Sequence, residues 1–294
     1  MSTDPSLTPG EEADGLREKT HLGPHLIIRP STGWVRLDMG SLWRYRGLLY
    51  FLVWRDVKVR YKQTLLGVLW AVLQPLLVML VFTIIFGHFA RLPSDGAPYA
   101  LFVYCALVPW TFFAQALSQS ANSLVDSSHL ISKVSFPRLV IPLAAALSAA
   151  VDAGVSLILL VCMLAFYGVT PTPALIAMPV FLGLAFLAAV AVGVWLSALN
   201  VQYRDVRYTI PFLVQLWFYA TPIVYPAGLI TGPWRFVLAL NPLTGVVEGC
   251  RWALIGAGTL DGLALAFSIG LTFMLLIAGL HYFRRVERRF ADVV

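Results

Sequence analysis

The sequence predicts an all-α polytopic membrane protein whose chain crosses the bilayer six times. Of its 294 residues, 59% are hydrophobic and 12% are charged, whereas soluble proteins carry about 25% charged residues. Uncharged stretches recur that are long enough to cross about 30 Å of hydrocarbon at about 1.5 Å per residue. The Lys and Arg residues gather between these stretches and at the two ends of the chain.

Two segments precede the first uncharged stretch. Residues 1–24 have acidic residues where a signal peptide is basic, so we expect a disordered cytoplasmic tail. Residues 42–64 interleave aromatic and basic side chains, which predicts an amphipathic helix at the membrane surface. The alternation of Val57, Val59 and Tyr61 also suits a strand, and a simple basic anchor is a second alternative.

The six predicted spans follow from the uncharged runs. The first run, residues 64–87, has 24 residues without a charged side chain. Residues 139–203 carry only Asp152 and are too long for one crossing, so we divide them at the glycine and two prolines of residues 168–173. The predicted spans are residues 66–88, 99–119, 139–167, 174–199, 208–225 and 262–283.

The basic residues predict the orientation. With the N-terminus in the cytoplasm, all but three of the 21 Lys and Arg residues fall on the cytoplasmic side, as the positive-inside rule requires. The three on the outer side are Arg91, Arg235 and Arg251. We therefore expect both termini, including residues 289–294, to be cytoplasmic. The net charge of +6 is an orientation signal and does not indicate nucleic-acid binding.

Two connections are more than simple turns. Residues 126–138 suit a short helix that begins near Asp126, Ser127 or Ser128 and is closed by Pro137, although an ordinary loop is an alternative. Toward and after the end of the fifth span, Pro222, Pro226, Pro233 and Pro242 break the chain into apolar pieces too short to cross, so we expect re-entrant helices in the outer leaflet over residues 226–256. Glu248 and Arg251 would share a helical face there, either as a self-neutralising pair or as a contact with substrate.

The sequence lacks the residues of several kinds of chemistry. It contains no G-x-x-x-x-G-K-[ST] phosphate loop and no D-x-D cluster, so we expect no catalytic residue, no metal site and no bound cofactor. Asp152 is essentially the one carboxylate in the spans, which argues against ion coupling. Aromatic residues make up 13% of the chain, and their faces suit stacking on sugar rings, although interfacial anchoring is the alternative for each. The candidate pathway residues are Trp70, Phe82, Phe86, Trp217, Phe218 and Tyr225, with Phe82 and Phe86 on one helical face.

Four blocks of sequence carry a resemblance to a known family. They are RDVKVRYKQTLLGVLWAVLQPL, VPWTFFAQALSQSANSLVDSSHLISKVSFPRLVIPL, LNVQYRDVRYTIPFLVQLWFYATPIVYP and NPLTGVVEGCRWALIG. In this order they resemble the transmembrane subunits of bacterial ABC transporters that export O-antigen, capsule and teichoic-acid polymers. The resemblance covers residues 25–288, which we take as one transmembrane domain.

The resemblance implies a homodimer in the bacterial inner membrane, with two copies of a separate ATPase subunit that bind ATP and Mg. The implied substrate is a polysaccharide on undecaprenyl pyrophosphate or a related lipid. O-antigen is the first choice; teichoic acid or capsule, or a lipid or drug, are the alternatives. A non-transporting scaffold or an enzyme is a third class.

The resemblance also implies roles for particular segments. Residues 42–64 would gate the cytoplasmic entrance, the first and fifth spans would line the channel, and residues 226–256 would shape the exit. A lipid phosphate at the entrance would meet Arg44, Arg46, Arg60 and Lys62. The segment that couples to the ATPase would comprise Asp126, Ser127, Ser128, His129, Leu130, Ile131 and Lys133. The exit region would include Asn241, Glu248 and Arg251.

Overall fold

Every regular element in the described part of the chain is a helix. The computed structural model describes residues 39–62, 67–131, 136–170, 172–203, 205–258 and 260–287. The predicted tails, 1–24 and 289–294, lie outside these residues. The elements are α1 (Met39–Arg44), α2 (Arg46–Lys62), α3 (Gly67–Phe82), the π-helix η1 (Thr83–Phe89), α4 (Tyr99–Asp126), α5 (Ser128–Ile131), α6 (Val140–Phe166), η2 (Pro173–Ala177), α7 (Met178–Gln202), α8 (Val206–Ala220), η3 (Ala227–Leu229), α9 (Trp234–Ala239), α10 (Thr244–Ile255) and α11 (Gly262–Glu287).

Five of the six predicted spans are confirmed as helices long and apolar enough to cross a bilayer. Within the described residues these candidate spans are Val72–Phe89, Tyr99–Asp126, Val140–Phe166, Pro173–Gln202 and Gly262–Glu287. The sixth prediction, residues 208–225, corresponds to α8, which has 15 residues. At about 1.5 Å per residue α8 is about 22 Å long, short of the hydrocarbon thickness, because Pro222 ends the helix. The six-span count therefore stays a prediction.

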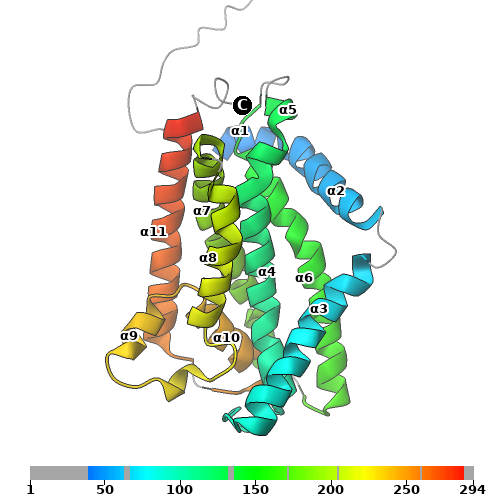
Figure 1. Cartoon of the computed structure of the whole chain (residues 1–294), viewed down its shortest axis with the longest axis vertical. Helices are drawn as coiled ribbons and strands as arrows, with labels where there is room; N and C mark the ends of the chain where they lie inside the picture. The colour runs from blue at the N-terminus through cyan, green and yellow to red at the C-terminus, as the bar shows by residue number, and fades with distance from the viewer. Residues whose placement is uncertain are drawn as a thin grey trace, which may run out of the picture. The chain divides into compact units, whose positions relative to one another are not determined.

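The core of the bundle is α4, which packs mainly against α6 and α7 and lies among the other long helices in Figure 1. Residues 100–108 are all buried. The close contact with α7 depends on small side chains, because a Cβ on Gly193 would lie 2.7 Å from Ser120. Small residues at helix interfaces allow this approach in an apolar solvent, where packing replaces the hydrophobic effect.

Three of the helices contain an internal proline. Pro75 lies in α3, Pro109 in α4 and Pro211 in α8. A proline removes one backbone hydrogen bond from the helix, which membrane helices tolerate when neighbouring groups compensate.

The segments predicted for the cytoplasmic entrance and the exit lie at opposite ends of the bundle. Figure 1 shows α1, α2 and α5 toward one end of the long helices and α9 and α10 toward the other. This placement follows from the alternating direction of α4, α6, α7, α8 and α11, and it separates the two predicted functional regions.

The predicted interface segment, residues 42–64, is helical and not a strand where it is described. It comprises two helices, α1 and α2, which are separated at Tyr45. The apolar and charged side chains of α2 are not segregated on opposite faces, so the prediction of an amphipathic helix is wrong on this point. The reason is the spacing: Phe51, Arg55 and Lys58 follow one another at intervals of four and three residues and share a face.

The region after α8 consists of short helices, as predicted for residues 226–256. An extended stretch with Pro222 and Pro226 leads to η3, α9 and α10. Gly256 ends α10 with a φ of 65°, a left-handed conformation that glycine adopts without strain. The depth of these helices in a membrane stays a prediction.

The packing of α11 on α7 gives a test of the bundle. A Cβ on Gly279 would lie 2.5 Å from the carbonyl oxygen of Ala191, whereas a Cβ on Gly270, on the same helix, meets nothing within 4 Å. We expect Gly279→Ala to destabilise the fold by about 1–3 kcal/mol through overpacking. Gly270→Ala should be neutral or stabilising because alanine favours a helix. Unfolding temperatures in detergent test this, and equal effects of the two variants would contradict the packing.

Candidate functional site

The end of α2 is bound to α6 through one buried carboxylate. Arg60 forms an ion pair with Asp152, and the hydroxyl of Tyr61 donates a hydrogen bond to the same carboxylate. A second nitrogen of Arg60 donates to Ser148 Oγ at 3.2 Å, and this hydroxyl donates to Gln119 Oε1 at 2.7 Å. We call these five residues from α2, α4 and α6 the Asp152 cluster. Asp152 is thus neutralised, as a buried charge must be.

The Asp152 cluster sets the course of α2. Asp152 lies twelve residues beyond Val140, the first residue of α6, or about 18 Å along that helix. The end of α2 therefore reaches well along α6 (Figure 1). Burial, followed by the hydrogen bond to Asp152 and its charge, raises the pKa of Tyr61 to about 12, so its hydroxyl remains a donor at neutral pH.

The four residues predicted to meet a lipid phosphate have different surroundings. Arg44, Arg46 and Lys62 are exposed, and the Arg46 guanidinium lies 5.1 Å from the centre of the Trp43 ring. Arg60 instead belongs to the Asp152 cluster. Sequence reasoning missed this pairing because the two residues are 92 positions apart.

The Asp152 cluster gives a test of how α2 is held. We expect Asp152→Asn to lower the free energy of unfolding by about 1–3 kcal/mol, because Arg60 loses its charged partner. Asp205→Asn, at an exposed carboxylate, is the control and should stay within about 0.5 kcal/mol. Replacing both charges with apolar residues, Arg60→Met with Asp152→Leu, should recover stability. Denaturation in detergent gives these values, and no recovery in the double variant would contradict the pairing.

The predicted coupling segment forms the tip of α4 and the short helix α5. Asp126 ends α4 and lies 3.4 Å from Arg207, near the start of α8, with both side chains about half exposed (54%). Ser127 is buried, and its carbonyl oxygen accepts a hydrogen bond from the Leu130 backbone N–H. Ser128 and Leu130 are half-buried and His129 is exposed. Ile131 ends α5, and Lys133 lies outside the described residues.

Aromatic rings from three helices meet beside a cavity of about 630 Å³ between α3, α4 and α8. The Phe218 ring centre lies 5.8 Å from that of Phe82 and 5.4 Å from that of Trp110. Phe86 packs on Phe82 with 5.7 Å between ring centres. The structure thus brings together Phe82, Phe86 and Phe218, three of the six predicted pathway aromatics.

The other three predicted aromatics lie apart from the cavity lining. Trp70 is exposed near the start of α3, and Tyr225 follows the end of α8. Trp217 packs on Phe113, with ring centres 5.0 Å apart, and its indole N–H donates to Asn241 Oδ1 at 2.9 Å.

Sequence reasoning also missed three residues of this cavity. Its lining includes Gln74, Gln115 and Gln215, one from each of the three helices. The sequence did contain a signal for these three residues. They are amide side chains inside apolar helices, where polar groups are costly and tend to be functional.

Arg251 links three parts of the chain at the end opposite α5. It is fully buried and pairs with Glu248 at 2.8 Å, three residues earlier on α10. Its guanidinium donates to the carbonyl oxygens of Phe102, Ile223 and Tyr225 at distances of 2.6–3.3 Å. The structure therefore shows the self-neutralising pair, one of the two alternatives for these residues.

Asn241 joins the end of α8 to the short helices. Its amide nitrogen donates to Thr221 Oγ1 at 2.9 Å, and its Oδ1 also accepts the backbone N–H of Leu243 at 3.0 Å. Together with the Trp217 contact, these bonds give Asn241 a positioning role at this end.

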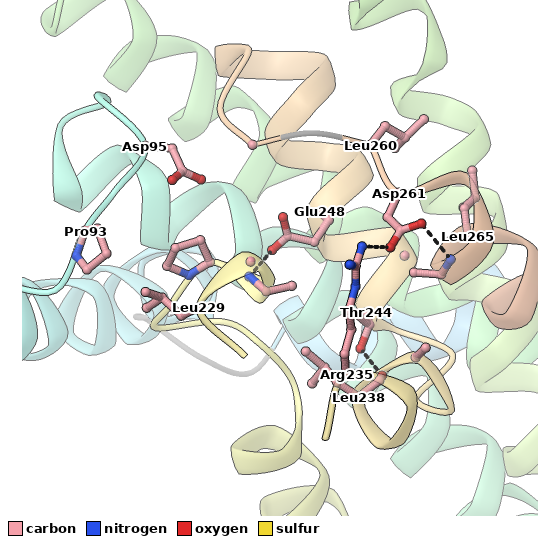
Figure 2. A pocket seen from close by; sticks show the side chains of 17 residues that line it. Pro93, Asp95, Leu229, Arg235, Leu238, Thr244, Glu248, Leu260, Asp261 and Leu265 are labelled. Carbon is pink, nitrogen blue, oxygen red and sulfur yellow. Dashed lines mark hydrogen bonds and ion pairs between the residues drawn. The ribbon is translucent and has the colours of Figure 1, made fainter. Parts of the chain in front are cut away.

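A second cavity, of about 640 Å³, lies among η3, α9, α10 and the start of α11. Figure 2 shows Asp95, Glu248 and Asp261 around it, with Arg235 paired to Asp261. The Asp261 carboxylate also caps α11, because it accepts the backbone N–H groups of Leu263 and Ala264. The hydrogen bond from Arg235, helped by the two backbone bonds, holds the pKa of Asp261 below its usual value.

The low pKa of Asp261 predicts a pH-dependent contribution to stability. Because the folded-state pKa is depressed, the stabilisation is present at neutral pH and is lost as the pH falls through the folded-state value. Asp261→Asn keeps a capping side chain and removes the charge. We expect it to be less stable than the wild type at pH 7, with a difference that begins to shrink at about pH 4 and vanishes once the pH is below the folded-state pKa of Asp261.

Unfolding temperatures measured between neutral and acidic pH test this prediction. Arg235→Met removes the same ion pair, so it should also be less stable than the wild type at neutral pH, and this difference should shrink over the same acidic pH range. A difference between Asp261→Asn and wild type that does not change with pH would contradict it.

In the described residues, no three or more His, Cys, Asp or Glu side chains gather where they could hold a metal ion.

Comparison with known proteins shows a consistent set of relatives. The family model described as ABC-2 type transporter matches residues 47–255. The chain is 31% identical to the O-antigen export system permease protein RfbA of Myxococcus xanthus, over 86% of this chain and 98% of that protein. The RfbA protein of Klebsiella pneumoniae is 29% identical, over 84% of this chain and 95% of its own. The polysialic acid transport protein KpsM of Escherichia coli is 22% identical, over 79% and 91%.

Proposed function

We propose that this chain, which belongs to the ABC-2 type transporter family, is the permease subunit of an ATP-driven exporter of lipid-linked polysaccharide. The observation that carries the proposal is the 31% identity to an O-antigen export permease along 98% of that protein's length. The five apolar helices and the cavity lined by aromatic side chains are consistent with a conduit. We assign it to the bacterial inner membrane.

A separate subunit supplies the ATP hydrolysis in this proposal. The sequence has no phosphate loop of its own. The docking place we assign to this partner is α5 with the tip of α4, because these residues project at the end that α2 shares (Figure 1). The partner subunit binds ATP and Mg. Both termini of the permease face the side of the membrane on which this partner lies, the cytoplasm.

A second copy of the chain completes the path. Support comes from α3 and α8, which line the aromatic cavity and also carry exposed apolar side chains such as Leu77, Leu80 and Phe212. In the proposed homodimer these first and fifth spans face the pathway. Two ATPase subunits then serve two permease chains.

The proposed cargo is O-antigen on undecaprenyl pyrophosphate. The exposed Arg44 and Arg46, where α1 meets α2, suit a pyrophosphate, because charge-assisted hydrogen bonds are strong. Lys62, also exposed, lies at the other end of α2. A capsule-type polymer is the second candidate, since one relative is a polysialic acid transporter.

Deletion of the gene tests the proposed function. We expect the deletion strain to lose its surface glycan while lipid-linked glycan accumulates inside, and the intact gene to restore export. Electrophoresis of surface polysaccharide measures the outcome. A normal surface glycan in the deletion strain would overturn the proposed function.

A substitution in α5 tests the coupling role. Leu130→Asp places a charge on a half-buried side chain of the docking helix, so glycan export and the ATPase activity of the purified complex should fall at least tenfold. Tyr167→Asp, after the last residue of α6 at the opposite end, is the control and should retain export. Full export by Leu130→Asp would remove α5 from the coupling role.

A further inference from the structure

The cavity between α3, α4 and α8 combines two kinds of group. Trp110, Phe218 and Tyr219 line it with aromatic rings, among which the Tyr219 side chain is exposed, and Gln74, Gln115 and Gln215 line it with amides. An amide both donates and accepts hydrogen bonds, as a hydroxyl does. Three amides from three helices therefore form a lining that matches a ligand with several hydroxyl groups and an apolar face.

In the part of the chain that the structure describes, Gln115 lacks a hydrogen-bond partner for its side-chain oxygen. Its Oε1 is buried and has no hydrogen-bond partner among the described residues. A buried polar atom without a partner is costly, and native proteins keep few of them without a reason. Gln115 is also a lining residue of the cavity, and a rotation of its side chain would turn this covered oxygen toward a ligand hydroxyl, which would supply the missing bond.

The cavity has the size of a ligand site and is uncharged. Its volume of about 630 Å³ is within the range of small-molecule pockets, about 300–1,000 Å³. Its lining contains no Asp, Glu, Lys or Arg. The Asp152 carboxylate, one turn from the lining residue Ser156, is already paired with Arg60. A carboxylate ligand placed here would lose its hydration without gaining a counter-charge.

We propose that this cavity binds neutral sugar units of the exported glycan and discriminates against anionic ones. The inference rests on the proposed export function and adds the chemical class of its cargo. The ring faces stack on the C–H side of a pyranose, and the three amides bond its hydroxyl groups. The cavity is therefore a specificity site for uncharged polymers.

The test uses the full chain with its ATPase subunit in nanodiscs of phosphatidylethanolamine and phosphatidylglycerol. The probes are maltoheptaose, which is neutral, and heptagalacturonate, which has the same length and a carboxylate on every unit. Calorimetry should give a Kd for maltoheptaose at least tenfold lower than for heptagalacturonate. Equal or tighter binding of heptagalacturonate, or no binding of either probe by the wild type, would overturn the proposal.

Substitutions locate the binding. Gln115→Leu and Gln215→Leu should each weaken maltoheptaose binding about two- to tenfold, because each removes one hydrogen bond to the sugar. Thr209→Val, on α8 but outside the cavity lining, is the control and should leave the Kd unchanged. Unaltered binding by both glutamine variants would overturn the assignment of the cavity.

Two further readouts separate sugar binding from a structural role of the amide and from occupation of the cavity by lipid. Gln115→Leu removes an unpartnered polar atom, so its unfolding temperature without sugar should not fall, whereas a purely structural amide would give a decrease. Mass spectrometry of bound lipid tests the competing occupant: a phospholipid retained by the wild type and displaced by neither probe would overturn the proposal.

The outcomes also separate this inference from the proposed function. Loss of surface glycan on deletion together with normal sugar binding by the glutamine variants would overturn only the cavity assignment. Sugar binding that depends on the glutamines together with an intact glycan in the deletion strain would overturn only the export function.

Discussion

The burial of α4 between α6 and α7 is the constraint on which the rest of the structure depends. A helix in an apolar solvent gains little by leaving that solvent, so its packing relies on close contact of small side chains. Ser120 against Gly193 provides such a contact on α4, and Gly279 against Ala191 repeats it between α7 and α11. With this core fixed, α3 and α8 remain at its surface and form the aromatic cavity against α4.

Two neutralised charges fasten the peripheral elements to this core. The Asp152 cluster holds the end of α2 on α6, and Arg251 holds α10 and the stretch after α8 against the start of α4. Each charge is satisfied by groups from other segments, as low-polarity surroundings demand. The charged residues near or within the apolar bundle are therefore attachment points, which explains their presence in a chain with few charges.

Much of the architecture follows from the sequence because uninterrupted apolar length is a local property. The runs that became α4, α6, α7 and α11 could each be predicted from composition alone, and the Glu248–Arg251 pair from a spacing of three residues. The shortness of α8 was harder to predict, since residues 208–225 are uncharged throughout and Pro222 is the signal that ends the helix. Composition also predicted that α2 is amphipathic, which its residue spacing does not support.

The cavity and the Asp152 cluster could not be predicted, because they depend on which helices become neighbours. Arg60 and Asp152 are 92 residues apart, and Gln74, Gln115 and Gln215 belong to three different helices. Nothing in the local pattern around any of these residues specifies the others. Sequence reasoning identified the aromatic members because rings are conspicuous in composition, and it passed over amides that only the fold brings together.

The prolines of α3, α4 and α8 determine where the walls of the aromatic cavity can bend. Each of these helices lacks one rung of its hydrogen-bond ladder, and two of the three prolines, Pro75 and Pro211, belong to the lining itself. Bending is easiest where a rung is missing. In the proposed exporter, the cavity can therefore widen by bending of these helices at their prolines while the rest of each wall stays rigid, so that bulky or branched sugar units pass without the bundle coming apart.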